Sequence, residues 1–253
     1  PELMQKYLAQ IDYEGEGPFP LYFERHYMSD TVARAGLGSG WSAPYFHRLI
    51  MQPESNASFV QVQSYQPGEP APRLSDPQLP ALPASVLVLS ETGAYYEFRR
   101  TGTSFKTDPI LPLGLEHRGG TYSYRVADDV TETYDASGRL LSLSDRNGLL
   151  HTLHYNGSGQ LVRVRHSLGR ELQFEYNPEG LLSVFIDPAG RRTRYSYEEG
   201  NLAEVRFADQ TSVRYLYEDV RFPRKLTGMI DERGVRTFTV TYDYRGRPVE
   251  TSG

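Results

Sequence analysis

A short motif built around tyrosine and glycine recurs at a fixed interval in the second half of the chain. The tyrosines of its four copies lie 21 residues apart, at Tyr134, Tyr155, Tyr176 and Tyr197. Two glycine columns keep the same spacing, one four residues after the tyrosines and one between them. They comprise Gly138, Gly159, Gly180, Gly148, Gly169 and Gly190. A fixed period of this length is typical of stacked repeats, in which neighbouring units bury a shared apolar face.

Each copy predicts two turns and two strands. An Asp or Asn after the tyrosine, followed by glycine, favours a tight turn, because Asx residues tolerate turn geometry and glycine adopts positive φ without strain. Between the turns the residues alternate, with Leu172, Phe174 and Tyr176 on one face and Glu171, Gln173 and Glu175 on the other. Period-two alternation indicates half-exposed strands. The repeats therefore predict an all-β fold, a ribbon of antiparallel hairpins that curls because strands twist with a fixed hand.

The repeat pattern weakens in residues 215–224 and returns at Tyr242, Asp243 and Gly246. We therefore expect two regions: an irregular β-rich domain in residues 1–120 and the repeats in residues 121–253. We find no amphipathic helical stripe of ten residues anywhere in the chain.

Within the first region, alternation predicts strands near 20–27 and 45–51. A hairpin is expected between 86–90 and 95–99. Dense proline in residues 53–83 indicates a loop, because proline removes donors from a strand ladder. Residues 101–120 are expected to be irregular.

The composition suits a thin sheet better than a thick core. Only 38% of residues are hydrophobic and the mean hydropathy is −0.54. The net charge of −5 argues against nucleic acid as a partner, since nucleic acid favours basic surfaces. With no cysteine, the chain forms no disulfide or thiolate metal site. No apolar run is long enough for a membrane span, and no signal peptide heads the chain.

No group of residues predicts catalysis, a metal site or a cofactor. His151 and His154 are the only close histidine pair, and residues three apart on a strand point to opposite faces, so they cannot share a metal. We expect each to be a surface or half-buried strand residue. The loop from Gly36 to Trp41 lacks the residues of a phosphate-binding loop, so we expect it to place Trp41 against a sheet. Arginines on the polar strand faces, such as Arg163 and Arg192, are expected to pair with acidic residues across strands.

The form Tyr-Asp-x-x-Gly-Arg-Leu at Tyr134 and Asp135, with its 21-residue phase, resembles the YD repeats of Rhs proteins. Literal Tyr-Asp occurs only there and at Tyr242 and Asp243, so the copies are degenerate. The segments 20–27 and 36–41 resemble the domain that precedes Rhs repeats in bacterial polymorphic toxins. Asp187-Pro-Ala-Gly190 is similar to the self-cleavage motif of some Rhs effectors, but its phase with Gly148 and Gly169 favours an ordinary repeat turn.

The resemblance implies a non-enzymatic shell segment, part of a β-cocoon that encloses a C-terminal toxin domain. It implies the rest of the shell and that toxin as partners, with a secretion spike protein and a chaperone as further partners. It also implies residence in the bacterial cytoplasm before export, and type VI secretion as the route into a target cell. The alternative is a carbohydrate or cell-surface binding module, because exposed tyrosines on strands can stack on sugar rings.

Overall fold

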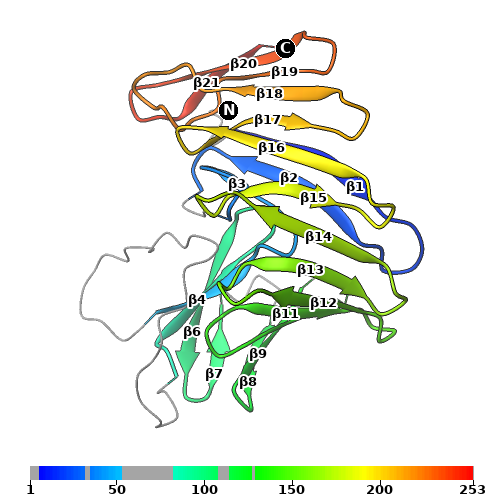
Figure 1. Cartoon of the computed structure of the whole chain (residues 1–253). Helices are drawn as coiled ribbons and strands as arrows, with labels where there is room; N and C mark the ends of the chain where they lie inside the picture. Colours follow the sequence, from blue (N-terminus) through cyan, green and yellow to red (C-terminus); the bar gives the residue numbers. More distant parts are fainter. Residues whose placement is uncertain (1–5, 32–34, 53–81, 108–113, 127–128, 253) are drawn as a thin grey trace.

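The computed structural model is an all-β chain (Figure 1). It describes residues 6–31, 35–52, 82–107, 114–126 and 129–252. Within these ranges no α-helix is present, and none of the segments there forms a helix able to cross a membrane. The strands form one long antiparallel sheet and one small sheet, as the hairpin repeats predicted.

In the long sheet, each strand from β4 to β21 pairs antiparallel with the next one along the chain. The strands before the repeats are β4 (Arg48–Gln52), β5 (Ser85–Leu89), β6 (Tyr95–Thr101), β7 (Ser104–Lys106), β8 (Gly114–Arg118) and β9 (Thr121–Arg125). The strands of the four clear repeats are β10 (Thr131–Tyr134), β11 (Leu140–Ser144), β12 (Leu150–Tyr155), β13 (Leu161–His166), β14 (Glu171–Tyr176), β15 (Leu182–Ile186), β16 (Arg192–Glu198) and β17 (Asn201–Arg206). The last strands are β18 (Ser212–Leu216), β19 (Gly228–Ile230), β20 (Arg236–Tyr242) and β21 (Pro248–Ser252).

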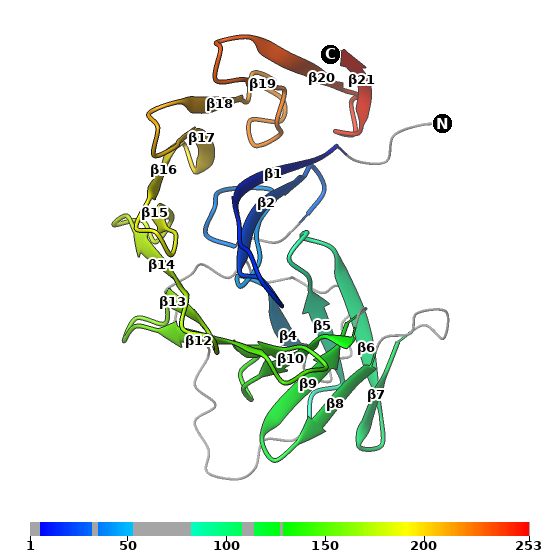
Figure 2. The same cartoon turned by 90° about the vertical axis from the view of Figure 1, so that its right-hand side faces the viewer.

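The register of the repeats shifts at every motif tyrosine. In five hairpins the pairing slips by one residue between the tyrosine and the residue before it, at Tyr134, Tyr155, Tyr176, Tyr197 and Tyr242. Such bulges bend a strand and increase its twist. The sequence period thus repeats a bend as well as a turn, and the ribbon curls into the arc seen in Figure 2.

The small sheet lies on the concave side of that arc (Figure 2). It contains β1 (Tyr7–Glu14), β2 (Tyr22–Met28) and β3 (Trp41–Ser42), in the order β1-β2-β3. Leu21, Phe23, Arg25 and Tyr27 alternate along or just before β2 and are all buried. The core therefore lies between the small sheet and the inner face of the repeats, and buried side chains of β5 to β9 extend it.

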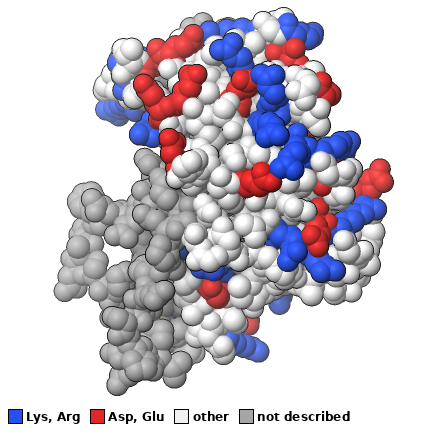
Figure 3. Space-filling model, viewed as in Figure 1, with Lys and Arg blue, Asp and Glu red and all other residues white. Residues whose placement is uncertain are grey.

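The convex face of the repeats carries both signs of charge, as Figure 3 shows. Arg192 pairs with Glu175 at 2.6 Å, and Arg163 and Arg165 both lie within 4 Å of Glu171. These are the expected cross-strand ion pairs. They are largely exposed, and exposed pairs stabilise a protein only slightly.

The expected hairpin between 86–90 and 95–99 is confirmed by the pairing of β5 with β6. The expectation that residues 101–120 are irregular is wrong, because β7 and β8 lie there and pair through Phe105 and Leu115. Each of these short strands buries only one large apolar side chain, so neither shows a clear alternating pattern. Of the proline-rich stretch 53–83, residues 53–81 lie outside the described residues.

Candidate functional site

Seven turns of the repeats share one hydrogen-bond arrangement. In the turn after Tyr134, the side chain of Asp135 accepts hydrogen bonds from the backbone N–H groups of Ser137 and Arg139, at 2.9 and 3.0 Å. Gly138 donates its N–H to the carbonyl of Asp135 and has φ of 90°. The same Asx arrangement recurs at Asp145, Asn156, Asn177, Asp187, Asp231 and Asp243. The segment Asp187-Pro-Ala-Gly190 is thus an ordinary repeat turn, as its phase predicted.

The glycines of these turns adopt the left-handed conformation. Gly138, Gly148, Gly159, Gly169, Gly180, Gly190 and Gly246 all have φ between 74 and 99°. A residue with a Cβ is strained in this region, which explains why glycine recurs at these positions. A Cβ added at Gly148, Gly169 or Gly190 would meet nothing within 4 Å, whereas Gly138 lies against the backbone of Leu49.

The motif tyrosines connect each repeat to the one before it. The hydroxyl of Tyr176 donates to the carbonyl of Leu161 at 2.6 Å, fifteen residues earlier in the chain. The equivalent bonds are Tyr155 to Leu140, Tyr197 to Leu182, Tyr217 to Leu202 and Tyr242 to Leu226, at 2.6–2.9 Å. We call these five contacts the tyrosine clamps. Each clamp binds the carbonyl of a leucine near the start of a strand, so it holds successive hairpins in one register.

Replacing Tyr176 with phenylalanine is expected to lower the free energy of unfolding by about 1–2 kcal/mol. The change removes only the hydroxyl and leaves the carbonyl of Leu161 without this donor in a largely buried place. Urea denaturation followed by circular dichroism measures the effect. Tyr244→Phe is the matched control, because the side chain of Tyr244 is 76% exposed. Equal losses in the two variants would show that the clamp contributes nothing.

The small sheet is attached to the repeats by a buried ion pair. Arg25 of β2 donates to both carboxylate oxygens of Asp12 in β1, at 2.7 and 2.9 Å, and both side chains are fully buried. Two repeat tyrosines complete the group. Tyr195 donates to Asp12 at 2.6 Å, and Arg25 donates to the hydroxyl of Tyr215 at 2.7 Å. We call Asp12, Arg25, Tyr195 and Tyr215 the buried polar cluster.

The electrostatics of the buried polar cluster favour the ionised pair. Burial disfavours the charge of Arg25, but the adjacent Asp12 carboxylate outweighs it and holds the pKa of Arg25 above its usual value. Burial and the same carboxylate raise the pKa of Tyr195, so its hydroxyl stays protonated and donates. The cluster is satisfied internally and presents no group for catalysis.

The glycine loop before Trp41 places that tryptophan against the repeats, as expected. Trp41 is fully buried, its ring lies 4.7 Å from that of Tyr215, and its indole N–H donates to Tyr217 at 3.0 Å. The same loop reaches the repeat backbone, because Ser39 donates its N–H to Gly200 and Leu182 donates to Gly36. The loop therefore follows the ends of several repeats in turn.

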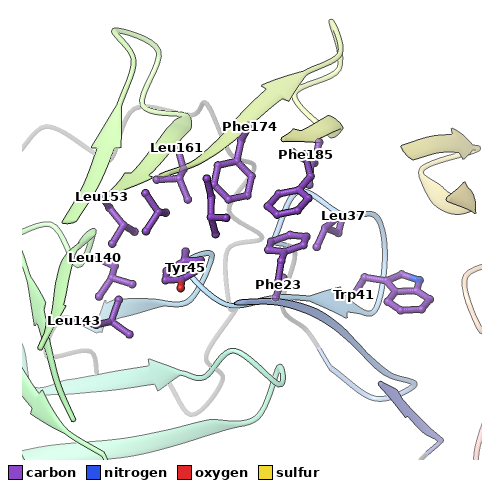
Figure 4. Close-up of a cluster of buried hydrophobic side chains, with 14 of the residues drawn as sticks. Phe23, Leu37, Trp41, Tyr45, Leu140, Leu143, Leu153, Leu161, Phe174 and Phe185 are labelled. Carbon is purple, nitrogen blue, oxygen red and sulfur yellow. The ribbon is translucent and has the colours of Figure 1, made fainter. Parts of the chain in front are cut away.

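Aromatic packing fills the space between the two sheets (Figure 4). The ring of Phe23 stacks on Phe185, with centroids 4.7 Å apart, and lies 5.6 Å from Phe174. Leu37 and Tyr45, also buried, project into the same space. These contacts join β2 to β14 and β15, which lie about 150 residues away in the chain.

The histidines differ from their sequence-based expectation. His151 and His154 do point to opposite faces, but His151 is buried, with only 1% of its surface exposed. It lies opposite His166 in the adjacent strand, and their ring centroids are 5.2 Å apart. Burial lowers the pKa of His151 to about 4. The pairing of β12 with β13 places these two histidines side by side. From the sequence, only the register between these two strands could have predicted that contact.

Another histidine, His47, joins the region before the repeats to their first strand. His47 lies 3.1 Å from Glu132 of β10, which also accepts a hydrogen bond from Tyr134. Burial opposes the charge of both partners. The pKa of His47 is nevertheless raised by Glu132, and the pKa of Glu132 is lowered by His47. Tyr134 therefore bonds to a carboxylate where the later motif tyrosines bond to a leucine carbonyl.

Within the described ranges, no group of three or more His, Asp or Glu side chains is arranged to hold a metal ion. Apart from Tyr134, which bonds to Glu132, the repeat residues that the sequence singled out form the turns and clamps of one continuous stack. The residues it did not single out, Asp12, Arg25 and His166, lie where the small sheet meets the stack. Arg25 carried a signal, because it falls in an otherwise apolar column between Phe23 and Tyr27.

The turns, clamps and register shifts define a protein built from stacked β-hairpin repeats. The family model of the RHS repeat matches residues 134–171 and 176–212, and a domain of unknown function, DUF6531, matches residues 5–66. The chain belongs to the RHS-repeat proteins.

Two solved structures match nearly the whole length of this chain. One is the Photorhabdus luminescens Tc holotoxin pore, with 16% identity, a TM-score of 0.35, and coverage of 98% of this chain and 12% of that one. Another is TcdB2-TccC3-Cdc42, with 15% identity, a TM-score of 0.34, and coverage of 95% of this chain and 14% of that one. This chain thus spans about an eighth of the length of those chains. No curated protein matches its sequence.

Proposed function

We propose that this chain is a wall segment of a hollow β shell that encloses a C-terminal toxin domain. The observation that carries the proposal is the uninterrupted antiparallel ladder from β4 to β21, bent at each motif tyrosine into an arc. A curved sheet whose convex face is charged is suited to form the wall of a shell, because that face can contact water. The division into residues 1–120 and 121–253 belongs to this proposal, with the later region as the repeating wall.

The proposed role is structural and not enzymatic. The motif residues act on neighbouring backbone: Asp135 and Asp243 close turns, and Tyr155, Tyr176, Tyr197 and Tyr242 form clamps. Their polar groups are thus occupied by the fold. The proposed partners are the remainder of the shell and the toxin inside it, with a secretion spike protein and a chaperone acting before export. Type VI secretion into a target cell is the proposed route.

The structure does not support the exposed repeat tyrosines on which the alternative, a carbohydrate or cell-surface binding module, was based. That alternative required repeat tyrosines exposed on the strands, but the clamp tyrosines are largely buried and their hydroxyls bond to backbone carbonyls. Tyr95 and Tyr244 are exposed, but Tyr95 lies before the repeats and Tyr244 in a late turn, so neither continues the clamp column.

Protease protection of the full-length gene product tests the proposal. We expect the toxin region to resist a nonspecific protease within the full-length protein and to be digested when it is expressed alone. The protease must digest the isolated region under identical conditions, which is the control. Mass spectrometry of the surviving fragments identifies the protected region. Digestion of the toxin region at the same rate in both contexts would contradict enclosure.

A further inference from the structure

The turn between β1 and β2 is held by two buried histidines of the repeats. The carbonyl oxygen of Phe19, in this turn, lies 2.8 Å from Nε2 of His151 and 3.0 Å from Nε2 of His166. Nε2 of His166 also lies 3.2 Å from the carbonyl of Pro18. The ring of Phe19 stacks on His151, with centroids 4.1 Å apart. One turn of the small sheet thus occupies a site made by two adjacent repeat strands.

The hydrogen bonds determine the protonation of both rings. A carbonyl only accepts, so Nε2 of each histidine must carry the proton that it donates to Phe19. Nδ1 of His166 accepts the backbone N–H of Leu168 at 2.9 Å, so that nitrogen carries no proton. Nδ1 of His151 lies 3.1 Å from the hydroxyl of Tyr45, which donates to it when His151 is neutral with its proton on Nε2. The docked turn therefore fits two neutral imidazoles, and the Leu168 N–H excludes a second proton at Nδ1 of His166.

We propose that His151 and His166 form an acid-sensitive latch that holds the β1–β2 turn on the repeats at neutral pH and releases it on acidification. A proton on Nδ1 of His166 would face the N–H of Leu168, so two hydrogen-bond donors would point at each other and the bond would be lost. Protonation of both rings would place two positive charges about 5 Å apart in a buried site. The latch goes beyond the proposed shell role, because it concerns how one sheet docks on another within the chain.

The groups around His151 do not cancel the lowering of its pKa by burial. Burial is the largest influence on His151 and lowers its pKa, and His166 lowers it further. The backbone of Phe19 and the carboxylate of Asp145 act in the opposite direction, and the outcome is a pKa of about 4. Other polar or charged groups on the packed elements include Tyr45, Tyr22 beside it with its partner Glu91, Tyr13 of β1, and Glu16 in the turn. Arg170 donates to the carbonyl of Glu16 at 2.7 Å.

The direction of the pH dependence follows from this lowered pKa. When the turn is docked, His151 is neutral; when the turn is released, its pKa returns to the ordinary value of 6.5. His151 therefore contributes fully to docking above pH 6.5. The contribution is lost as pH falls toward about 4. At pH 5 the difference between the two pKa values weakens docking of the turn about 30-fold.

Hydrogen–deuterium exchange of residues 15–21 measures this release. After correction for the intrinsic exchange rate, we expect protection of the turn to fall about 30-fold between pH 7.5 and pH 5. Strand β14 serves as the internal reference, because it belongs to the stack and should keep its protection. Unchanged corrected protection of the turn at pH 5 would overturn the proposal.

Variants identify the groups responsible. His151→Gln combined with His166→Gln keeps an N–H donor for the Phe19 carbonyl and removes both imidazole rings, so we expect the acid response to disappear. His154→Gln is the matched control, since it lies on the same strand but faces away, and it should keep the full response. A full response in the double variant would assign the effect elsewhere, for example to the buried His26, and would overturn the latch.

A measurement on the unaltered chain covers the case in which the double variant does not fold. Nitrogen-15 chemical shifts of the imidazoles report which ring nitrogen carries the proton. At pH 7.5 we expect both His151 and His166 to be neutral with the proton on Nε2. A proton on Nδ1 of either ring, or a charged ring at this pH, would contradict the arrangement on which the latch depends.

Discussion

Replacing Arg25 with alanine is expected to lower the free energy of unfolding by about 3–5 kcal/mol. The change leaves the Asp12 carboxylate in a fully buried position, where only the hydroxyl of Tyr195 still donates to it. It also removes the donor to Tyr215. An uncompensated buried charge is costly because water no longer solvates it. The small sheet should therefore separate from the repeats, and the fluorescence of Trp41, the chain's only tryptophan, should report this.

The exposed ion pair of the convex face provides the control for this prediction. Arg192 lies 2.6 Å from Glu175, as close as the buried pair, but about half of each side chain is exposed. Arg192→Ala should therefore cost less than about 1 kcal/mol. Urea denaturation of both variants compares the same substitution in two environments. If Arg25→Ala cost no more than Arg192→Ala, the buried polar cluster would not hold the two sheets together.

The sequence predicts the repeat stack well because its signals are local and recur. Asp135 and Gly138 lie within one turn, and the clamp of Tyr176 connects residues fifteen apart. Each repeat presents the same signal again, so a degenerate copy is still recognised by its phase. Alternation also identified β2 and its buried face, including the column that contains Phe23.

The docking of the small sheet could not be predicted, because it depends on contacts between distant parts of the chain. Arg25 and Tyr215 are 190 residues apart, and Phe19 and His151 are 132 apart. No local period relates these residues. The charged Arg25 within an apolar column was a usable signal for a buried partner. Its carboxylate partner Asp12 lies in the adjacent strand, but the contacts of this pair with Tyr195 and Tyr215 depend on the curvature of the whole ribbon. The short strands β7 and β8 were missed for a different reason, since too few residues alternate there.

Gly138→Ala is expected to lower the free energy of unfolding by about 2–5 kcal/mol. Two effects add: φ of 90° is strained for a residue with a Cβ, at about 1–2 kcal/mol, and overpacking typically adds about 1–3 kcal/mol. A Cβ on Gly138 would approach the carbonyl oxygen of Leu49 far inside van der Waals contact. The turn would have to move away from β4, which breaks the bond from the Leu49 N–H to the Gly138 carbonyl, at 2.9 Å.

Gly148→Ala separates the two effects, because Gly148 closes an equivalent repeat turn with φ of 82° but nothing lies within 4 Å of its added Cβ. It should cost about 1–2 kcal/mol, the backbone strain alone. Thermal or urea unfolding of both variants gives the difference, which measures how tightly the first repeat turn packs on β4. Similar losses of unfolding free energy in the two variants would mean that β4 can move away from the turn at little energetic cost. A clearly larger loss for Gly138→Ala would show that the turns do more than reverse the chain, since one of them also anchors the strand that begins the ladder.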